Sequence, residues 1–369
     1  MFDRKEAIKK KIIAQDKAVL MLGKTRRILL SWATGVGKTL ASLKMVEKYY
    51  AYKPTIKGYI ICKETTHLDN WDEDIEAHGM GFIHNIADFF LYDSLHKHSD
   101  KGFVDFVIMD ECHAVTEKRA EHLKKIIGPD TLVIMLSATV DWKKQTLIRT
   151  VTKSFNEYHI SIGEAIKEGL LPSPVVVVHK VTMRSDERIE YERLSKEVNK
   201  WGDEYQANGD KWKQIKWVNA GSVRKRAMAE MKTTFAVKLV EDFGEARFIC
   251  FNGSTWQAEE LAGDTDNYIH SGRSKKENKL VKDEFNLLKR NSLFVVNMMR
   301  EAINLTKVEK GLIVQLDNVK LSFIQMLGRV FRSNFPEMHI IVYKDTQDEV
   351  YLNRVMKDFP VKYVKTLEY

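Results

Sequence analysis

Ala33-Thr34-Gly35-Val36-Gly37-Lys38-Thr39 joins an apolar, strand-like segment at 27–32 to a segment at 40–46 whose apolar residues recur at helical spacing. A strand, a glycine loop and a helix in this order are typical of a phosphate-binding loop. Glycines let backbone N–H groups point at phosphate oxygens, and the helix N-terminus adds partial positive charge. We therefore predict that this loop binds ATP, with Lys38 on the β- and γ-phosphates and Thr39 on Mg²⁺. The alternative is an ordinary turn between a strand and a helix.

Length and composition indicate two folded domains and a polyanionic partner. The chain has 369 residues, of which 44% are hydrophobic, enough to fill more than one core. Its formal net charge of +8 favours nucleic acid over an acidic protein or a membrane surface. The alternative is that the excess positive charge lies on a solvated surface and binds no partner.

Cysteine usage and hydropathy bear on the compartment. Cys62, Cys112 and Cys250 are widely spaced, which excludes a disulfide scaffold and a zinc knuckle and indicates a reducing compartment. The first residues are charged, and no apolar run approaches the ~18 residues that a membrane span needs. We expect a cytoplasmic monomer, nuclear if the source has a nucleus, with no membrane contact.

Alternating strands and helices predict a parallel sheet in the first half of the chain, with working loops at the carboxyl ends of the strands. Lys63, Thr65 and Ser94 follow two of these strands, so they share an edge with the phosphate loop. We expect them to contact a ligand that lies across that edge.

The apolar strand 103–109 ends in Asp110-Glu111-Cys112-His113. Asp110 suits the Mg²⁺ shell, and Glu111 suits polarisation of the attacking water. A solvated acidic loop is the alternative. Gln15, on a predicted helix at 4–22, carries an amide that can both donate to and accept from an adenine edge, although an isolated helical glutamine is usually a surface residue.

Gln325, Gly328, Arg329 and Arg332 fall at i, i+3, i+4 and i+7, which is one face of a helix. A face with two arginines and a small residue between them suits a polyphosphate.

Residues 33–39, 110–113 and 137–139, in this order, resemble motifs I, II and III of the superfamily 2 helicases and translocases, and 325–332 resembles motif VI. Three shorter segments extend the resemblance over nearly the whole chain. They are 68–71, similar to the end of motif Ia in DNA-acting branches; 160–172, similar to the exit from the first domain in restriction-type members; and 301–306, similar to motif V with Ala302 in place of glycine.

The resemblance implies an α/β fold of two tandem RecA-like parallel-sheet domains, 1–171 and 172–369, with ATP in the cleft between them and a helical insertion at about 186–232. It implies that Arg332 is the arginine finger, with Arg329 beside it on the γ-phosphate. Further residues implied by the resemblance contact the nucleotide, couple the two sites or contact nucleic acid. They are Gln15, His113 and Gln325 for the nucleotide; Ser137 and Thr139 for coupling; and Lys63, Thr65, Ser94, Ser271 and Asn304 for nucleic acid.

The predicted insertion contains the run 211–217, in which lysines alternate with two tryptophans. Lys211, Trp212 and Trp217 are expected to bind phosphates and stack on bases. An amphipathic helix with buried tryptophans is an equal alternative.

These features predict a nucleic-acid-stimulated ATPase, a DNA helicase that uses ATP and Mg²⁺. A duplex-DNA translocase that does not unwind is the first alternative, and Asn70-Trp71 and 304–306 lean towards it. An ATP-gated clamp with negligible turnover is the second. The Asp110-Glu111 pair and the two motif VI arginines argue against a clamp.

Overall fold

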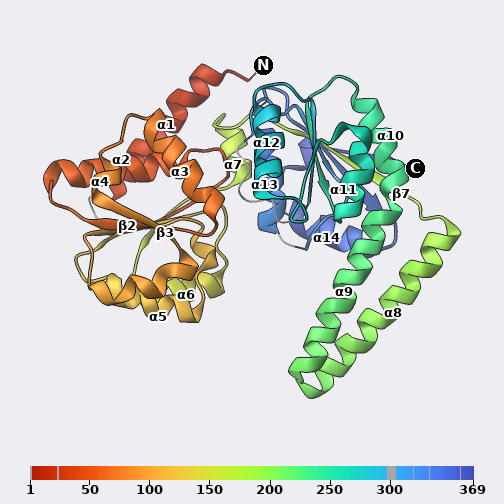
Figure 1. The fold of residues 1–369 in the computed structure, drawn as a ribbon, viewed down its shortest axis with the longest axis horizontal. Coiled ribbons are helices and arrows are strands. Elements are labelled where there is room, and N and C mark those ends of the chain that lie inside the picture. The colour runs from red at the N-terminus through yellow and green to blue at the C-terminus, as the bar shows by residue number, and fades with distance from the viewer. Residues whose placement is uncertain (1, 23–24, 297–304, 319, 332, 358) are drawn as a thin grey trace. The chain divides into compact units, whose positions relative to one another are not determined.

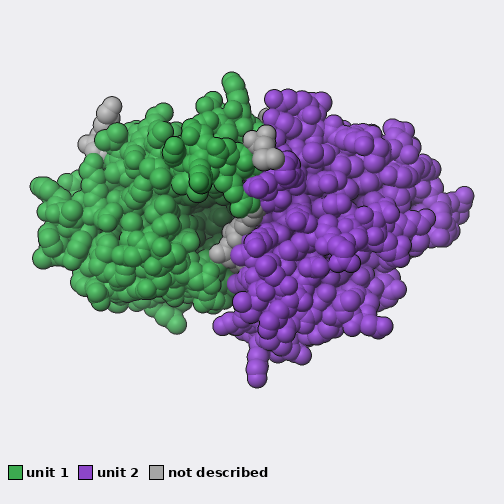
Figure 2. Space-filling view, turned by 90° about the horizontal axis from the view of Figure 1, so that it is seen from above, with its two compact units in different colours: residues 1–172 green, residues 173–369 purple. Residues whose placement is uncertain are grey.

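The computed structural model describes the chain except for residues 1, 23–24, 297–304, 319, 332 and 358. The chain divides into two compact units, Met1–Pro172 and Ser173–Tyr369 (Figures 1 and 2). Each unit is built around one parallel sheet, so the predicted fold class is confirmed.

Unit 1 contains a six-stranded sheet in the order β3-β2-β4-β5-β1-β6, and every pairing in it is parallel. Its strands are β1 (Arg27–Trp32), β2 (Gly58–Cys62), β3 (Ala87–Leu91), β4 (Phe106–Met109), β5 (Leu132–Ser137) and β6 (Asn156–Ile160). The central strands β1, β2, β4 and β5 are almost wholly buried, which explains their continuous apolar sequences. Because all strands run the same way, their carboxyl ends meet at one edge of the sheet.

Helices cover both faces of this sheet. Figure 1 shows α2 and α3 on one face and α5 and α6 on the other, as expected for right-handed crossovers. The helices are α1 (Arg4–Leu22), α2 (Lys38–Tyr52), α3 (Thr65–Ala77), α4 (Ile83–Ile86), α5 (Glu117–Ile126), α6 (Trp142–Thr152) and α7 (Ile162–Lys167). Short 3₁₀ helices follow β3 and β4, namely η1 (Tyr92–Lys97), η2 (Ser99–Lys101) and η3 (Cys112–Ala114).

Unit 2 contains a seven-stranded sheet in the order β13-β7-β12-β11-β8-β10-β9, again with parallel pairings. Its strands are β7 (Val175–Val181), β8 (Phe248–Asn252), β9 (Tyr268–Ile269), β10 (Ser292–Val296), β11 (Lys310–Ile313), β12 (Glu337–Tyr343) and β13 (Val364–Glu368). Its helices are α8 (Ser185–Asn208), α9 (Lys211–Met231), α10 (Thr233–Phe243), α11 (Thr255–Ala262), α12 (Lys275–Asn286), α13 (Lys320–Val330) and α14 (Gln347–Met356).

The predicted helical region is a hairpin of two helices, α8 and α9, which projects from the sheet of unit 2 (Figure 1). We call this hairpin the arm. Gly209 ends α8 with a left-handed φ of 64°, and the Asp210 side chain caps the N-terminus of α9. Among the described residues, no helix is long and apolar enough to cross a bilayer.

Candidate functional site

The phosphate loop has the backbone that its glycines predict. Gly35 and Gly37 have φ of 89° and 101°, a region that residues with a side chain rarely adopt. Lys38 is the first residue of α2, and its Nζ donates to the Trp32 carbonyl oxygen at 2.9 Å, so the side chain folds back over the loop. This geometry leaves a lysine and a helix N-terminus at the end of β1.

Helix α1 holds the loop from outside. Lys11 Nζ donates to the Gly35 carbonyl at 2.7 Å, a contact that no sequence pattern signalled. Gln15 is only 3% exposed, and a Cβ placed on Gly37 would lie 2.6 Å from its Nε2. The Oε1 of Gln15 has no hydrogen-bond partner among the described residues. Gln15 therefore lies against the phosphate loop with an unused acceptor, which suits the predicted contact with adenine.

Asp110 follows β4 and is oriented by α3. Its Oδ2 accepts a hydrogen bond from Trp71 Nε1 at 3.1 Å and lies 3.4 Å from His67 Nδ1. Its Oδ1 accepts from the backbone N–H of Glu111 at 3.0 Å. Trp71 is 2% exposed, so the run 68–71 contributes a buried support for Asp110.

Glu111 has a left-handed φ of 47°, and its Oε2 lies 3.1 Å from His113 Nδ1. Burial opposes its ionisation, yet the His113 side chain and the positive charge of Lys38 outweigh burial and hold the pKa of Glu111 at about 2. Glu111 is therefore a carboxylate at neutral pH, the state that can accept a hydrogen bond from water.

His113 also joins the segments predicted as motifs II and III. Its Nδ1 lies 3.1 Å from Ser137 Oγ, which donates to the Thr139 carbonyl oxygen at 2.9 Å. A displacement of the 137–139 segment would thus reach Glu111 through one imidazole.

The residues at this edge suit Mg²⁺ by chemistry. The described residues hold no cluster of three or more His, Cys, Asp or Glu side chains that could bind a metal. A hydroxyl at Thr39 and a carboxylate at Asp110 supply the oxygen donors that Mg²⁺ prefers, and phosphates and waters normally complete its shell. The described side chains therefore fit a metal that is bound together with a nucleotide.

The predicted nucleic-acid contacts of unit 1 follow strand ends on the same sheet edge. Half-buried Lys63 follows β2, exposed Thr65 begins α3, and half-buried Ser94 lies in η1 after β3. In unit 2, exposed Ser271 follows β9, while Asn304 lies outside the described residues.

Helix α13 carries the predicted motif VI residues Gln325 and Arg329, which are both buried. The amide of Gln325 makes no hydrogen bond to any described residue. An amide left with unused donors and acceptors in a buried position is suited to a ligand. Arg332 lies outside the described residues.

The structure separates the two tryptophans of the arm. Trp217 stacks on Tyr205 with ring centroids 5.9 Å apart and lies against Gly202, where a Cβ would approach its Nε1 to 3.1 Å. Trp212 is 61% exposed, and Lys216 Nζ lies 5.2 Å from its ring. Trp217 thus packs within the hairpin, and Trp212 faces solvent, as does Lys211.

Comparison with known proteins gave a family match to the first part of the chain. Residues 3–141 match the family ResIII, described as "Type III restriction enzyme, res subunit". A comparison with curated protein sequences gave no match.

Several solved structures have a similar fold over almost the whole chain. Dbp5 of S. cerevisiae, bound to RNA and ADP BeF3, is 12% identical with a TM-score of 0.66, covering 96% of this chain and 89% of that one. The Type ISP restriction-modification enzyme LlaBIII, bound to DNA, is 12% identical with a TM-score of 0.62, covering 97% of this chain and 31% of that one. The helicase Lhr of Mycobacterium smegmatis, bound to ssDNA and AMP-PNP, is 17% identical with a TM-score of 0.60, covering 93% and 48%.

The chain therefore shares its fold with these proteins, among them the helicase Lhr. The match over residues 3–141 and the shared fold agree with the predicted resemblance to the superfamily 2 helicases and translocases.

Proposed function

We propose that this chain is a DNA helicase that couples Mg-ATP hydrolysis to movement along DNA and to strand separation. One observation carries the proposal most: the buried Oε2 of Glu111 lies 3.1 Å from His113 Nδ1, and the charge of Lys38 in the phosphate loop stabilises the ionised carboxylate. An ionised carboxylate in that position can orient a water for attack on the γ-phosphoryl group. A clamp with negligible turnover has no use for it.

Each residue has a distinct role in this proposal. Lys38 and the loop amides hold the phosphates, Thr39 and Asp110 hold Mg²⁺, and Glu111 orients the water. Arg329 and Arg332 of unit 2 then neutralise charge that develops during hydrolysis. Ser137 couples this chemistry to DNA through His113, because it contacts the imidazole that lies beside Glu111.

DNA is proposed over RNA because residues 3–141 match a restriction-enzyme family. The net charge of +8 suits either polyanion. The similar structures include complexes with RNA as well as with DNA.

We further propose that the protein acts as a cytoplasmic monomer.

Duplex translocation without unwinding is the second candidate, because a DNA-bound restriction-modification enzyme shares the fold. The run Asn70-Trp71 gives it less support than the sequence suggested, since the Trp71 indole is buried on Asp110.

Two displacement assays separate the candidates when run on the same preparation with ATP. A helicase releases the labelled strand of a partial duplex. A duplex translocase displaces a third strand from a blunt triplex and leaves the partial duplex intact. Triplex displacement without strand release would overturn the helicase proposal in favour of translocation.

A further inference from the structure

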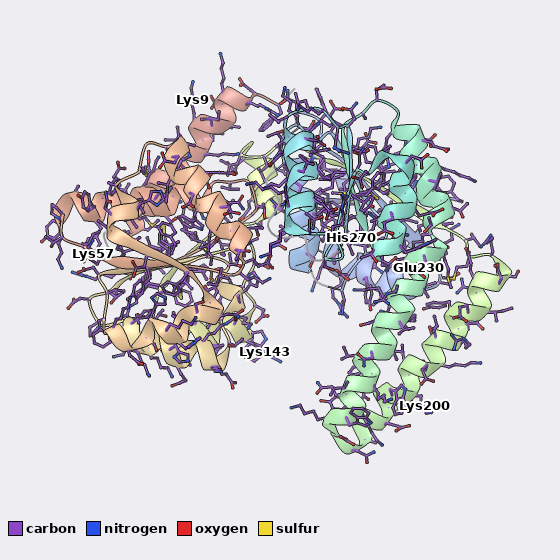
Figure 3. The ribbon with its side chains drawn as sticks, viewed as in Figure 1. Lys9, Lys57, Lys143, Lys200, Glu230 and His270 are labelled. Carbon is purple, nitrogen blue, oxygen red and sulfur yellow. The ribbon has the colours of Figure 1, made fainter. Side chains whose placement is uncertain are left out.

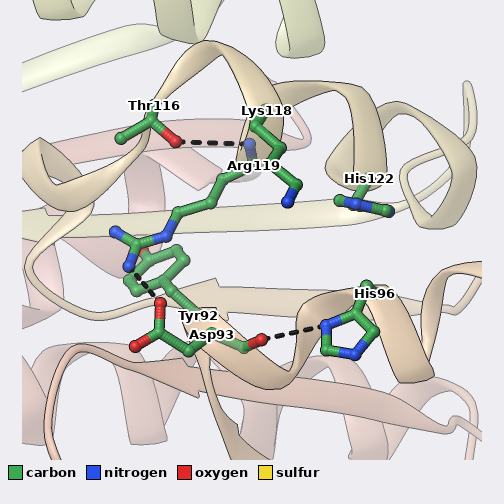
Figure 4. A pocket seen from close by; sticks show the side chains of 7 residues that line it. All are labelled: Tyr92, Asp93, His96, Thr116, Lys118, Arg119 and His122. Atoms are coloured by element: carbon green, nitrogen blue, oxygen red, sulfur yellow. Dashed lines mark hydrogen bonds and ion pairs between the residues drawn. The ribbon is translucent and has the colours of Figure 1, made fainter.

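Two hollows lie at the N-terminal end of α5 in unit 1, on the sheet edge that carries the phosphate loop. The first, of about 310 Å³, is lined in part by Asp93, His96, Arg119 and His122 (Figure 4). The second, of about 490 Å³, is lined in part by Lys143 and Lys144 of α6. Thr116 and Lys118 line both hollows, so the two form one continuous surface, which we call the α5 surface.

Cationic side chains outnumber carboxylates on the α5 surface. Lys118, Arg119, Lys143 and Lys144 line it, against Asp93 and Glu117. Lys118 is exposed and forms no ion pair with the residues that the structure describes. Lys143, near the start of α6 (Figure 3), is exposed as well. The surface therefore suits a polyanion.

Arg119 lines the first hollow and is held in place by three contacts. Its Nη1 donates to the Ala114 carbonyl at 2.5 Å, and its guanidinium lies 5.4 Å from the Tyr92 ring centroid. Its Nη2 donates to Asp93 Oδ1 at 2.6 Å, and the Asp93 side chain is 80% exposed (Figure 4). An exposed carboxylate is weakly bound, so an incoming phosphate oxygen can take its place on a guanidinium that is already oriented.

The α5 surface adjoins positions already proposed to contact nucleic acid. Ser94 lies in η1, between two residues that line the first hollow, Asp93 and His96. Next to the second hollow, Trp142 is 71% exposed, with Lys143 Nζ 5.7 Å from its ring. An exposed indole beside lysines offers a base-stacking platform next to phosphate contacts.

We propose that the α5 surface binds the phosphate backbone of the nucleic acid on which the motor acts, with Lys118, Arg119 and Lys143 as phosphate contacts and Trp142 as a stacking residue. The proposal rests on the proposed function and adds contacts outside the helicase motifs. Arg119 also donates to the carbonyl oxygen of Ala114, three residues after Glu111. A strand bound to Arg119 would therefore be one hydrogen bond away from the proposed catalytic loop.

The test compares two double variants by salt-titrated binding to single-stranded DNA and RNA of equal length. Lys118→Ala with Lys143→Ala removes two proposed contacts. Lys124→Ala with Lys125→Ala is the matched control, because these exposed lysines line neither hollow. We expect the first variant to flatten the slope of log affinity against log salt by ~0.7 per lost contact, and the control to keep the wild-type slope. Melting of both variants checks that the fold is retained.

Two other outcomes distinguish a failure of this inference from a failure of the proposed function. If wild-type protein binds nucleic acid and both variants keep its slope, the α5 surface is not a backbone site, and an acidic protein becomes its better partner. If wild-type protein binds neither DNA nor RNA, the proposed function fails together with this inference.

Discussion

Asp110 is fixed by contacts from α3, since the indole of Trp71 donates to its Oδ2 and the ring of His67 lies 3.4 Å from the same oxygen. Burial tends to lower the pKa of His67, but the hydrogen bond and charge of Asp110 outweigh burial and raise it. These contacts orient the carboxylate, whose side chain stays 18% exposed. We therefore propose that Trp71 and His67 position Asp110.

Trp71→Phe removes the N–H donor and keeps most of the apolar volume. We expect the Mg²⁺ concentration that gives half-maximal ATPase activity to rise by about tenfold, the usual effect of losing a partner of a metal ligand. Titration of Mg²⁺ at saturating ATP measures this, and Trp256→Phe, at a half-exposed site in unit 2, is the control. An unchanged Mg²⁺ dependence with a lowered melting temperature would make Trp71 a packing residue only.

Glu111→Gln tests the proposed catalytic role of this carboxylate. We expect Mg-ATP binding to persist while turnover falls by a factor of about 10² or more, because the water loses its base. Lys38→Ala should instead weaken nucleotide binding. Binding of a fluorescent ATP analogue and single-turnover hydrolysis distinguish the two variants. Wild-type turnover in Glu111→Gln would refute the assignment.

The sequence was sufficient to place Lys38 at the start of a helix after its glycines and Asp110-Glu111 after a buried strand. The chemical roles of these residues stay predictions. The sequence was insufficient for Trp71 and Lys11. Their contacts with Asp110 and Gly35 join elements far apart in the sequence, and neither residue type has a spacing that signals such a contact.

At the scale of elements, the arm shows that a residue pattern alone does not predict which side chains of a helix are buried. Basic residues interleaved with tryptophans are compatible with both a stacking surface and a buried face, and the arm contains both. Trp217 faces α8, and Trp212 faces solvent. Gly209 ends α8 and so divides the predicted helical region into two helices. The packing of these two helices determines which face of α9 is covered.

Single replacements in the arm should have opposite effects. Trp212→Ala should weaken nucleic-acid binding by about 1–3 kcal/mol and leave melting unchanged, because an exposed stacking ring is lost. Trp217→Ala should lower the melting temperature, because it leaves a gap against Tyr205 and Gly202. Fluorescence anisotropy and thermal melting on both variants provide the measurements. Unchanged binding in Trp212→Ala would assign the arm to another role.

Strands β7 and β12 carry stacked histidines whose Nε2 (His179) and Nδ1 (His339) lie 2.9 Å apart. Burial, with repulsion from His339, lowers the pKa of His179 to about 4 against an opposing effect of Glu337, and burial with the charge of Lys310 lowers that of His339 to about 4. Both histidines bind protons more readily in the unfolded chain, where the ordinary pKa is about 6.5. Their neutral pairing therefore favours the fold above pH ~6.5, and this stability is lost as the pH falls towards 4.

The free energy of unfolding of unit 2, measured by denaturant titration between pH 7 and pH 4, should fall as the pH is lowered. His179→Gln should give a shallower pH dependence, whatever its effect on stability at pH 7. A slope equal to that of the wild type would show that the pair does not control acid stability.

At the scale of the whole molecule, the alternation of strands and helices predicted the parallel sheet of the first half, and the resemblance implied the second sheet. The alternation did not predict β6 or β13. Strands β6 and β13 each lie at an edge of their sheet and carry exposed polar residues. Edge strands bury little, so their sequences lack the continuous apolar runs that identify central strands. Strand order also depends on crossovers that no local pattern records.

The chemistry proposed for ATP is divided between the units. The phosphate loop and the carboxylates belong to unit 1, and Arg329 and Arg332 belong to unit 2. If both sets of residues contact one ATP molecule only when nucleic acid is bound, the ATPase turnover depends on nucleic acid.

The steady-state ATPase rate with and without nucleic acid tests this account most directly. Wild-type protein should turn over slowly alone and faster, well beyond experimental scatter, with single-stranded or duplex DNA, and Glu111→Gln should stay slow in both conditions. RNA as a third substrate tests the preference for DNA. Equal wild-type rates with and without any DNA or RNA would contradict the motor and indicate a stand-alone phosphohydrolase.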